Sequence, residues 1–142
     1  MTRALRQLER AALAPVQPGE LLLWAQAVAE ALDAVRLGWS HRERRHRELR
    51  REIARTDAAL YHRLATLSKR ARRHLRELVE LRVQARSLRL ELQQGGERAT
   101  HRERAWELRD RVVYWNIALR VLDNELDAWF AEAFYRDRGV AH

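Results

Sequence analysis

The chain has 142 residues, of which 46% are hydrophobic and 34% charged, with no cysteine and two prolines. This length suits one domain with its own core, and a composition poor in glycine and proline is typical of long helices rather than strands. The lack of cysteine excludes disulfides and thiolate sites, and no apolar run reaches the roughly 18 residues of a membrane span. We therefore expect an all-α, cytoplasmic protein without a secretory signal.

The net charge of +8 is concentrated in the middle of the chain. Residues 41–94 hold sixteen basic side chains against seven acidic ones, and all the basic residues except Lys69 are arginines. The rest of the chain is close to neutral. Such an arginine-rich segment can attract nucleic acid, an acidic protein or membrane headgroups, but it is also typical of a solvated helix face.

The first predicted element is a short amphipathic helix that begins at Thr2 and ends near Ala14. Pro15 to Gly19 follow as a connector, because proline stops a helix and glycine favours a turn. The second predicted helix runs from Glu20 to about Leu37, and Gly38 suits the position that ends it.

A capping box at Ser40-His41-Arg42-Glu43 predicts that another helix begins here, because the serine and the glutamate satisfy unpaired backbone amides reciprocally. The apolar stripe of this helix lapses at Thr56 and Asp57, which predicts a break. One continuous helix over 41–94 is the alternative. From Leu60 the stripe continues to Leu92, and Gly95-Gly96 is the clearest turn signal in the chain.

A second capping box, Thr100-His101-Arg102-Glu103, predicts the start of the last helix, which should end near Arg138 at Gly139. Its apolar residues alternate in steps of three and four, as in a coiled-coil seam: Ala105, Leu108, Val112, Trp115, Leu119, Leu122, Leu126, Trp129 and Ala133. A second apolar row comprises Val113, Ile117, Val121 and Ala128. A helix that is apolar on nearly all sides must be buried, either in a bundle or at a subunit interface.

The helices at about 58–94 and 101–138 are matched in length and joined by a short loop, so they should form an antiparallel hairpin. The helices at 20–37 and 41–55 together span about the same length and would cover it. The expected fold is an all-α, antiparallel up-and-down four-helix bundle with a short N-terminal helix. The expected domain organisation is a helix and Pro/Gly connector at 1–19 and a bundle domain at 20–140.

Two stretches of this predicted bundle carry a family pattern. Leu60-Tyr61-His62-Arg63-Leu64-Ala65-Thr66-Leu67, leading on to Arg73-His74-Leu75 and Glu77-Leu78, resembles the third helix of hemerythrin-like domains. Asp123-Asn124-Glu125-Leu126 and then Ala133-Phe134-Tyr135-Arg136-Asp137-Arg138-Gly139-Val140 resemble the end of the fourth helix in bacterial members of that group. The resemblance implies a four-helix bundle that holds a non-haem di-iron centre through histidine and carboxylate pairs at helical spacing.

The chain departs from this ligand pattern. Only His74 matches a ligand position, Leu78 stands four residues after it, and the last helix has no histidine before Asp123. We therefore expect a bundle without a competent di-iron site. No metal or other cofactor is predicted, with His74 as a weak candidate ligand and iron as the alternative left open.

The other histidines and carboxylates favour structural roles. Glu43 and His46 have the Glu-x-x-His spacing of ferritin-like di-iron bundles, but such a site needs a second copy and further glutamates. His74 is better explained by pairing with Glu77 or Glu80 at the edge of the bundle. No carboxylate pair or nucleophile–base set falls on one helix face, so we predict no catalytic residues and no enzyme.

Two groups of residues are the remaining candidates for function. The basic surface comprises Arg44, Arg47, Arg51, Arg55, Arg72 and Arg76, and either forms i,i+4 ion pairs in solvent or attracts an anionic partner. The interface or core group of the last helix comprises Val113, Trp115, Asn116, Ile117 and Trp129. Asn116 lies in its most apolar part, where it needs a hydrogen-bond partner and would fix helix register or oligomeric state.

Three functional hypotheses follow. The first is a hemerythrin-like bundle without a di-iron site that acts as a binding or assembly module and forms a homo-oligomer through the last helix. The second is a basic helical protein that binds nucleic acid or an acidic partner without sequence specificity. The third is a non-haem iron protein that senses oxygen or redox state.

Overall fold

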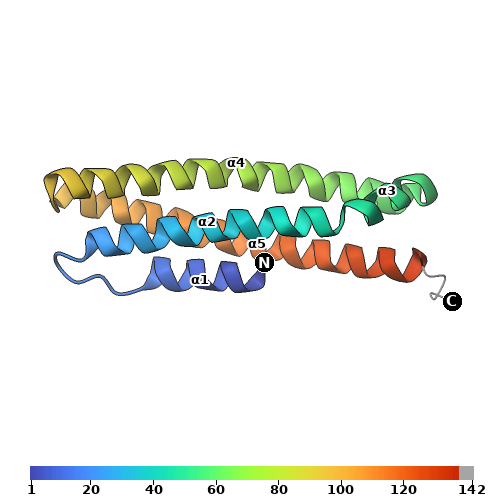
Figure 1. Cartoon of the computed structure of the whole chain (residues 1–142), viewed down its shortest axis with the longest axis horizontal. Helices are drawn as coiled ribbons and strands as arrows, with labels where there is room; N and C mark the ends of the chain where they lie inside the picture. The colour runs from blue at the N-terminus through green and yellow to red at the C-terminus, as the bar shows by residue number, and fades with distance from the viewer. Residues whose placement is uncertain (138–142) are drawn as a thin grey trace.

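The computed structural model describes residues 1–137, which contain five helices and no strand. The helices are α1 Thr2–Leu13, α2 Leu21–Arg45, α3 Arg47–Thr56, α4 Ala58–Gly95 and α5 Ala99–Asp137. They lie roughly along one long axis, so that this part of the chain forms a rod (Figure 1). The predicted all-α class is confirmed. The expected helix end at Arg138 and Gly139 lies outside the described residues.

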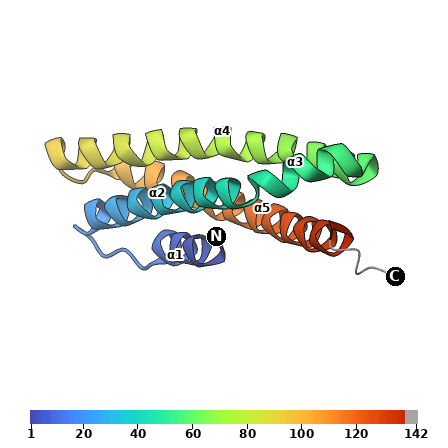
Figure 2. The same cartoon turned by 45° about the vertical axis from the view of Figure 1, so that its right-hand side comes forward.

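The two long helices, α4 and α5, pack against each other and are joined by the short loop after Gly95 (Figures 1 and 2). Gly96 has φ 72°, a left-handed conformation that glycine adopts without steric cost, and its amide donates to the carbonyl of Leu92 at 3.2 Å. The predicted turn is therefore confirmed. On its other side α4 packs against α2, and α3 continues along the first part of α4.

Helix α1 packs against α2 and α5 and covers part of the length of the rod (Figure 1). Its buried side consists of Leu5, Leu8 and Ala12, which have no solvent exposure. The side chain of Asn116 donates to the carbonyl of Leu5 at 2.8 Å, which gives this buried amide the partner it needs. Thus α1 shares one core with the longer helices. The predicted domain division at residue 19 stays a prediction.

The predicted stop at Gly38 is wrong, because α2 continues through it to Arg45. The Ser40 hydroxyl donates to the carbonyl of Arg36 at 3.2 Å, as in a helix interior, so the predicted capping box does not form. A glycine inside a helix costs about 1 kcal/mol relative to alanine. Burial on both sides of Gly38 outweighs this, because the side chains of Val35 and Trp39 both lie in the core.

The break predicted at Thr56 and Asp57 is confirmed, because α3 ends at Thr56 and α4 begins at Ala58. The capping box predicted at Thr100 to Glu103 is wrong. Asp57 is the N-cap of α4, and its Oδ1 accepts a hydrogen bond from the amide of Leu60 at 3.0 Å. Helix α5 already begins at Ala99, so Thr100 lies inside it. The ring nitrogen Nδ1 of His101 accepts from the amide of Arg98 at 3.2 Å instead. The predicted four-helix topology, with 20–37 and 41–55 as separate members, is not confirmed.

The core runs along the inward side of α5. All nine residues of its predicted seam, from Ala105 to Ala133, are buried. The second row differs: Val113 is partly buried against the core, whereas Ile117, Val121 and Ala128 are exposed. This single chain therefore does not enclose α5 on nearly all sides. Within residues 1–137, no helix combines the length and apolar character needed to span a membrane.

Candidate anion-binding groove

Two adjoining hollows lie between the end of α2, α3 and the first part of α4, and we call them together the basic groove. Their volumes are about 540 and 480 Å³. The break at His46 separates α2 from α3 at this place, so that the side chains of both helices face α4 across the groove. Six basic side chains line it: Arg44, Arg47, Arg50, Arg51, Lys69 and Arg72.

These basic side chains have little negative charge around them. Among the described residues, Glu43 is the only acidic one that lines either hollow. It pairs with Arg50, whose guanidinium nitrogen lies 2.9 Å from its carboxylate oxygen. The other five form no ion pair within residues 1–137. Because like charges held together repel each other, the groove has a positive potential that an anion would relieve.

Four of the six arginines of the predicted basic surface line this groove. They are Arg44, Arg47, Arg51 and Arg72. Arg55 and Arg76 are exposed and do not line it. The alternative of a face covered by i,i+4 ion pairs does not match the structure, since α3 has no ion pair other than Arg50–Glu43 among the described residues. The predicted set lacked Arg50 and Lys69.

The floor of the groove contains an unpaired donor. A cavity of about 20 Å³ adjoins the larger hollow, and Trp39 lines both. Trp39 is 4% exposed, and its indole N–H has no hydrogen-bond partner. Leaving such a donor buried and unsatisfied costs about 1–3 kcal/mol. The cavity is large enough for about one small molecule the size of water.

His46 lies beside this cavity and stacks on Phe130 of α5, with ring centroids 3.8 Å apart. Burial is the main cause that lowers the pKa of His46, and the charges of Arg42 and Arg45 lower it further. The imidazole is therefore neutral at pH 7, and His46 adds no positive charge to the groove.

Arg42 is separate from the groove surface, although the sequence places it in the same basic run. It is 5% exposed and pairs with Asp123, which is 3% exposed, across the core between α2 and α5. It also donates to the carboxylate of Asp127 at 2.6 Å. Burial lowers the pKa of this guanidinium, against the opposing effect of Asp127. Arg42 thus connects α2 and α5 and lines neither hollow of the groove.

His74, the weak candidate metal ligand, lies half-buried on α4, and burial lowers its pKa. Its Nδ1 has no hydrogen-bond partner, and its backbone carbonyl accepts from the indole of Trp115 at 3.0 Å. In the described part of the chain, no group of three or more histidine, cysteine, aspartate or glutamate residues is placed to hold a metal ion. His74 therefore belongs to no such group there.

The predicted interface or core residues of α5 lie on different sides of it. Trp115, Asn116 and Trp129 are buried within the chain, and Trp129 donates to the carbonyl of Leu60 at 2.7 Å. Val113 is partly buried, and Ile117 is 58% exposed. Only Ile117 and its exposed neighbours are therefore accessible to a second molecule.

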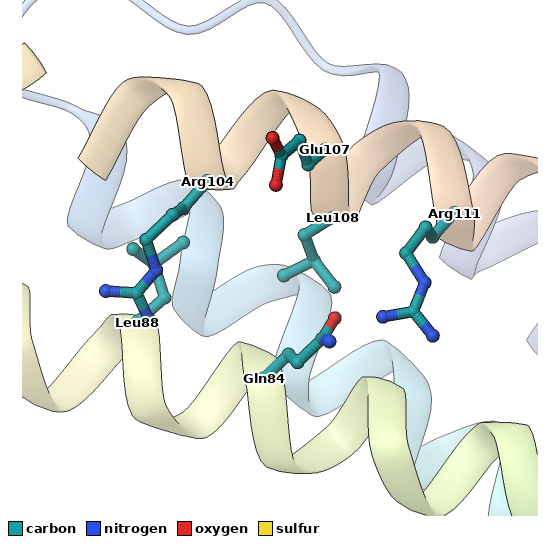
Figure 3. A pocket seen from close by; sticks show the side chains of 6 residues that line it. All are labelled: Gln84, Leu88, Arg104, Glu107, Leu108 and Arg111. Carbon is teal, nitrogen blue, oxygen red and sulfur yellow. The ribbon is translucent and has the colours of Figure 1, made fainter. Parts of the chain in front are cut away.

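A third hollow, of about 270 Å³, lies on the seam between α4 and α5 and provides a contrast. Figure 3 shows Arg104 and Arg111 extending from α5 toward α4 on either side of Gln84. Both arginines are already paired, Arg104 with Glu91 and Arg111 with Glu80. This hollow has no surplus positive charge with which to attract an anion.

Comparison with known proteins adds no relative. No protein-family model matches the chain, and neither a curated protein nor a solved structure matches it significantly. The resemblance to hemerythrin-like domains stays a prediction.

Proposed function

We propose that this protein is a helical binding module that holds the phosphate backbone of a nucleic acid in the basic groove, without reading base sequence. One observation carries the proposal: six basic side chains from three helices converge on one groove that contains a single carboxylate. Phosphates that enter it replace mutual repulsion by attraction and release the counterions condensed on the nucleic acid.

The groove combines guanidinium donors with an exposed aromatic ring, which favours a nucleic acid over an acidic protein. Five of its six basic side chains are arginines, whose planar guanidinium groups bind phosphate oxygens in pairs. Tyr61, which is 47% exposed, lines the same groove and can stack on an unpaired base. We therefore propose single-stranded RNA or DNA as the ligand.

Binding of fluorescein-labelled single-stranded oligonucleotides, followed by anisotropy over a series of salt concentrations, tests this function. If four phosphates are neutralised, log K should fall with log salt with a slope of about −3. Replacing Arg44, Arg47, Arg51 and Arg72 by glutamine should abolish binding at physiological salt.

The matched control replaces Arg3, Arg6, Arg10 and Arg98 by glutamine, which removes the same charge from exposed sites on α1 and before α5. This control should retain most of the affinity. No binding at low salt, or an equal loss in both variants, would contradict the proposal.

A second proposed function is self-assembly, which the exposed side of α5 favours. Tyr114 is 79% exposed, Ile117 58% and Val121 49%, and all three lie on one side of the helix. We propose that this side forms a homo-oligomer interface. Sedimentation velocity at micromolar concentration should then show an oligomer that Ile117→Glu dissociates, while Leu23→Glu on α2, another exposed position, leaves it intact. A monomeric wild-type protein would exclude this function.

That the bundle is a hemerythrin-like domain which has lost its di-iron site is also a proposal. The loss of the di-iron site is supported by the lack, among the described residues, of any group of three potential metal ligands around His74. Metal analysis of protein purified without oxygen is the test. Iron at about two atoms per chain would contradict the loss of the site and favour an oxygen or redox sensor instead.

A further inference from the structure

We infer that the basic groove contains a discrete seat for one phosphate group, formed by Arg47, Arg50, Arg72, Ser68 and the indole N–H of Trp39. This inference rests on the proposed function, because it names the point at which the nucleic acid is anchored. The inference also goes beyond the proposed function, since a diffuse basic surface needs no discrete site for one phosphate.

The position of the seat follows from how the two hollows meet. Arg47, Arg50, Ser68 and Arg72 line both of them. A group bound among these four side chains therefore lies where the hollows join. It would be within reach of guanidinium groups from α3 on one side and α4 on the other. Tetrahedral phosphate, with oxygens pointing in several directions, suits donors that converge from two helices.

The buried donor at the floor is the independent observation that points to a ligand. The other buried tryptophans of residues 1–137 each donate to a backbone carbonyl: Trp24 to Ala12, Trp115 to His74 and Trp129 to Leu60. Trp39 is equally buried, yet its indole N–H has no acceptor. Trp39 lines the larger hollow together with Arg47 and Arg72, but its indole nitrogen itself is covered, so a phosphate oxygen can supply that acceptor once it displaces the atoms that cover the nitrogen.

Ser68 supplies a second unused donor. The hydroxyls of Ser40, Thr56 and Thr66 each donate to the carbonyl four residues earlier in their helix. Ser68 and Ser87, both partly buried on α4, make no such bond among the described residues, and of the two only Ser68 lines the hollows. Its hydroxyl is therefore available to a ligand in both hollows. Serine and arginine donors together are a common combination in phosphate sites.

Glu43 acts as the competitor for this seat. Its carboxylate pairs with Arg50, so a phosphate must displace it to use that guanidinium. Removing its charge should therefore strengthen phosphate binding. Removing this charge also raises the potential of the whole groove, so the variant supports the seat only together with Ser68→Ala, which removes no charge.

The test uses the full chain, labelled with ¹⁵N, and inorganic phosphate at constant ionic strength. The indole N–H signal of Trp39, assigned with Trp39→Phe, should shift and saturate as phosphate is added. Ser68→Ala should weaken the apparent affinity about five- to tenfold, Arg72→Gln should weaken it at least as much, and Glu43→Gln should strengthen it. The matched controls are Thr66→Ala, whose hydroxyl is already bonded, and Arg76→Gln, which lies outside the groove.

A shift that never saturates, or one that Ser68→Ala leaves unchanged, overturns the seat. An unaffected Trp39 signal overturns it as well and leaves the small cavity as a site for water alone. Oligonucleotide binding separates this failure from failure of the proposed function. If Ser68→Ala binds oligonucleotides as wild type does while the four-arginine variant does not, the seat is wrong and the function stands. If phosphate saturates the seat but no oligonucleotide binds, the function is wrong and the seat stands.

Two sources of the phosphate group are distinguished by the same oligonucleotides with and without a 5′-phosphate. A terminal phosphate monoester as ligand predicts tighter binding of the phosphorylated strand, and Ser68→Ala should remove the difference. An internucleotide phosphodiester predicts equal affinity for both strands, with an equal loss in Ser68→Ala. Either result supports the seat and identifies its ligand.

Discussion

The two sides of α4 carry the same kind of side chain and differ in what stands opposite. Toward α5, Arg63 pairs with Glu132 and Arg70 with Glu125, and Glu80 of α4 receives Arg111. Toward α3, Lys69 and Arg72 face further arginines across the basic groove. Each of these ion pairs between α4 and α5 brings opposite charges together, whereas the groove between α3 and α4 brings like charges together.

This difference divides the arginines into a paired group and a largely unpaired group. Along the seam, arginine and glutamate from facing helices complement each other and help set which helices are neighbours. In the groove, five of the six basic side chains have no ion pair among the described residues. Such uncompensated charge costs stability and is expected at a binding site rather than at a packing surface. The predictions below test whether the two regions differ in energy as they do in geometry.

The largest effect is expected for Arg42, which lies beneath the groove but forms ion pairs, as the arginines between α4 and α5 do. Arg42→Gln leaves the carboxylate of Asp123 buried without its cation, so the free energy of unfolding should fall by about 3–5 kcal/mol. Urea unfolding followed by circular dichroism measures this. The double variant Arg42→Gln/Asp123→Asn should recover part of the loss, because no isolated charge remains. If Arg42→Gln alone is as stable as wild type, Arg42 contributes no more to stability than the unpaired arginines of the groove.

The sequence contains a signal for this buried arginine that is visible only if α2 is read as continuous. Leu32, Val35 and Trp39 are buried at steps of three and four, and Arg42 is the next position on that side. Gly38 and the capping box at Ser40 to Glu43 predict a helix end there, so the predicted apolar face of this helix ends at Val35. Local capping signals failed because burial of Val35 and Trp39 holds the helix together across Gly38.

Other parts of the fold could be predicted because local signals and burial agree there. The seam of α5, the break at Asp57 and the turn at Gly96 each follow from spacing or from one residue type. The groove could be predicted only as a basic segment. Which arginine meets a carboxylate depends on the rotation of facing helices. Neither the role proposed for Ser68 nor the unpaired indole of Trp39 has a signal in the sequence.

A smaller effect is expected from pH, through the two histidines with lowered pKa. Burial lowers the pKa of His46 and His74 in the folded chain below the ordinary value of 6.5. The unfolded chain therefore binds more protons near and below pH 6.5. Stability that is fully present above that pH should be lost as the pH falls through the folded pKa values. Thermal melts between pH 7.5 and 5 should show this loss.

His46 also connects pH to the groove. Arg42 and Arg45 oppose its protonation, and a bound polyanion would offset their charge. The pKa of His46, measured by its ring proton signals, should therefore rise when an oligonucleotide is present, whereas that of His74, away from the groove, should stay constant. A pKa of His46 that does not respond to saturating ligand would place the anion elsewhere.

The smallest effect is the most direct test of the comparison, because it contrasts one arginine from each region at exposed positions. Arg70→Gln removes the exposed pair with Glu125 and should lower the free energy of unfolding by about 0.2–1 kcal/mol. Arg47→Gln removes a groove arginine without an ion pair, so relief of repulsion should raise it by a few tenths of a kcal/mol. Both effects should shrink in 1 M salt, where the Debye length is about 3 Å. Measured side by side in low salt, equal signs would mean that the groove arginines are compensated as fully as those of the seam.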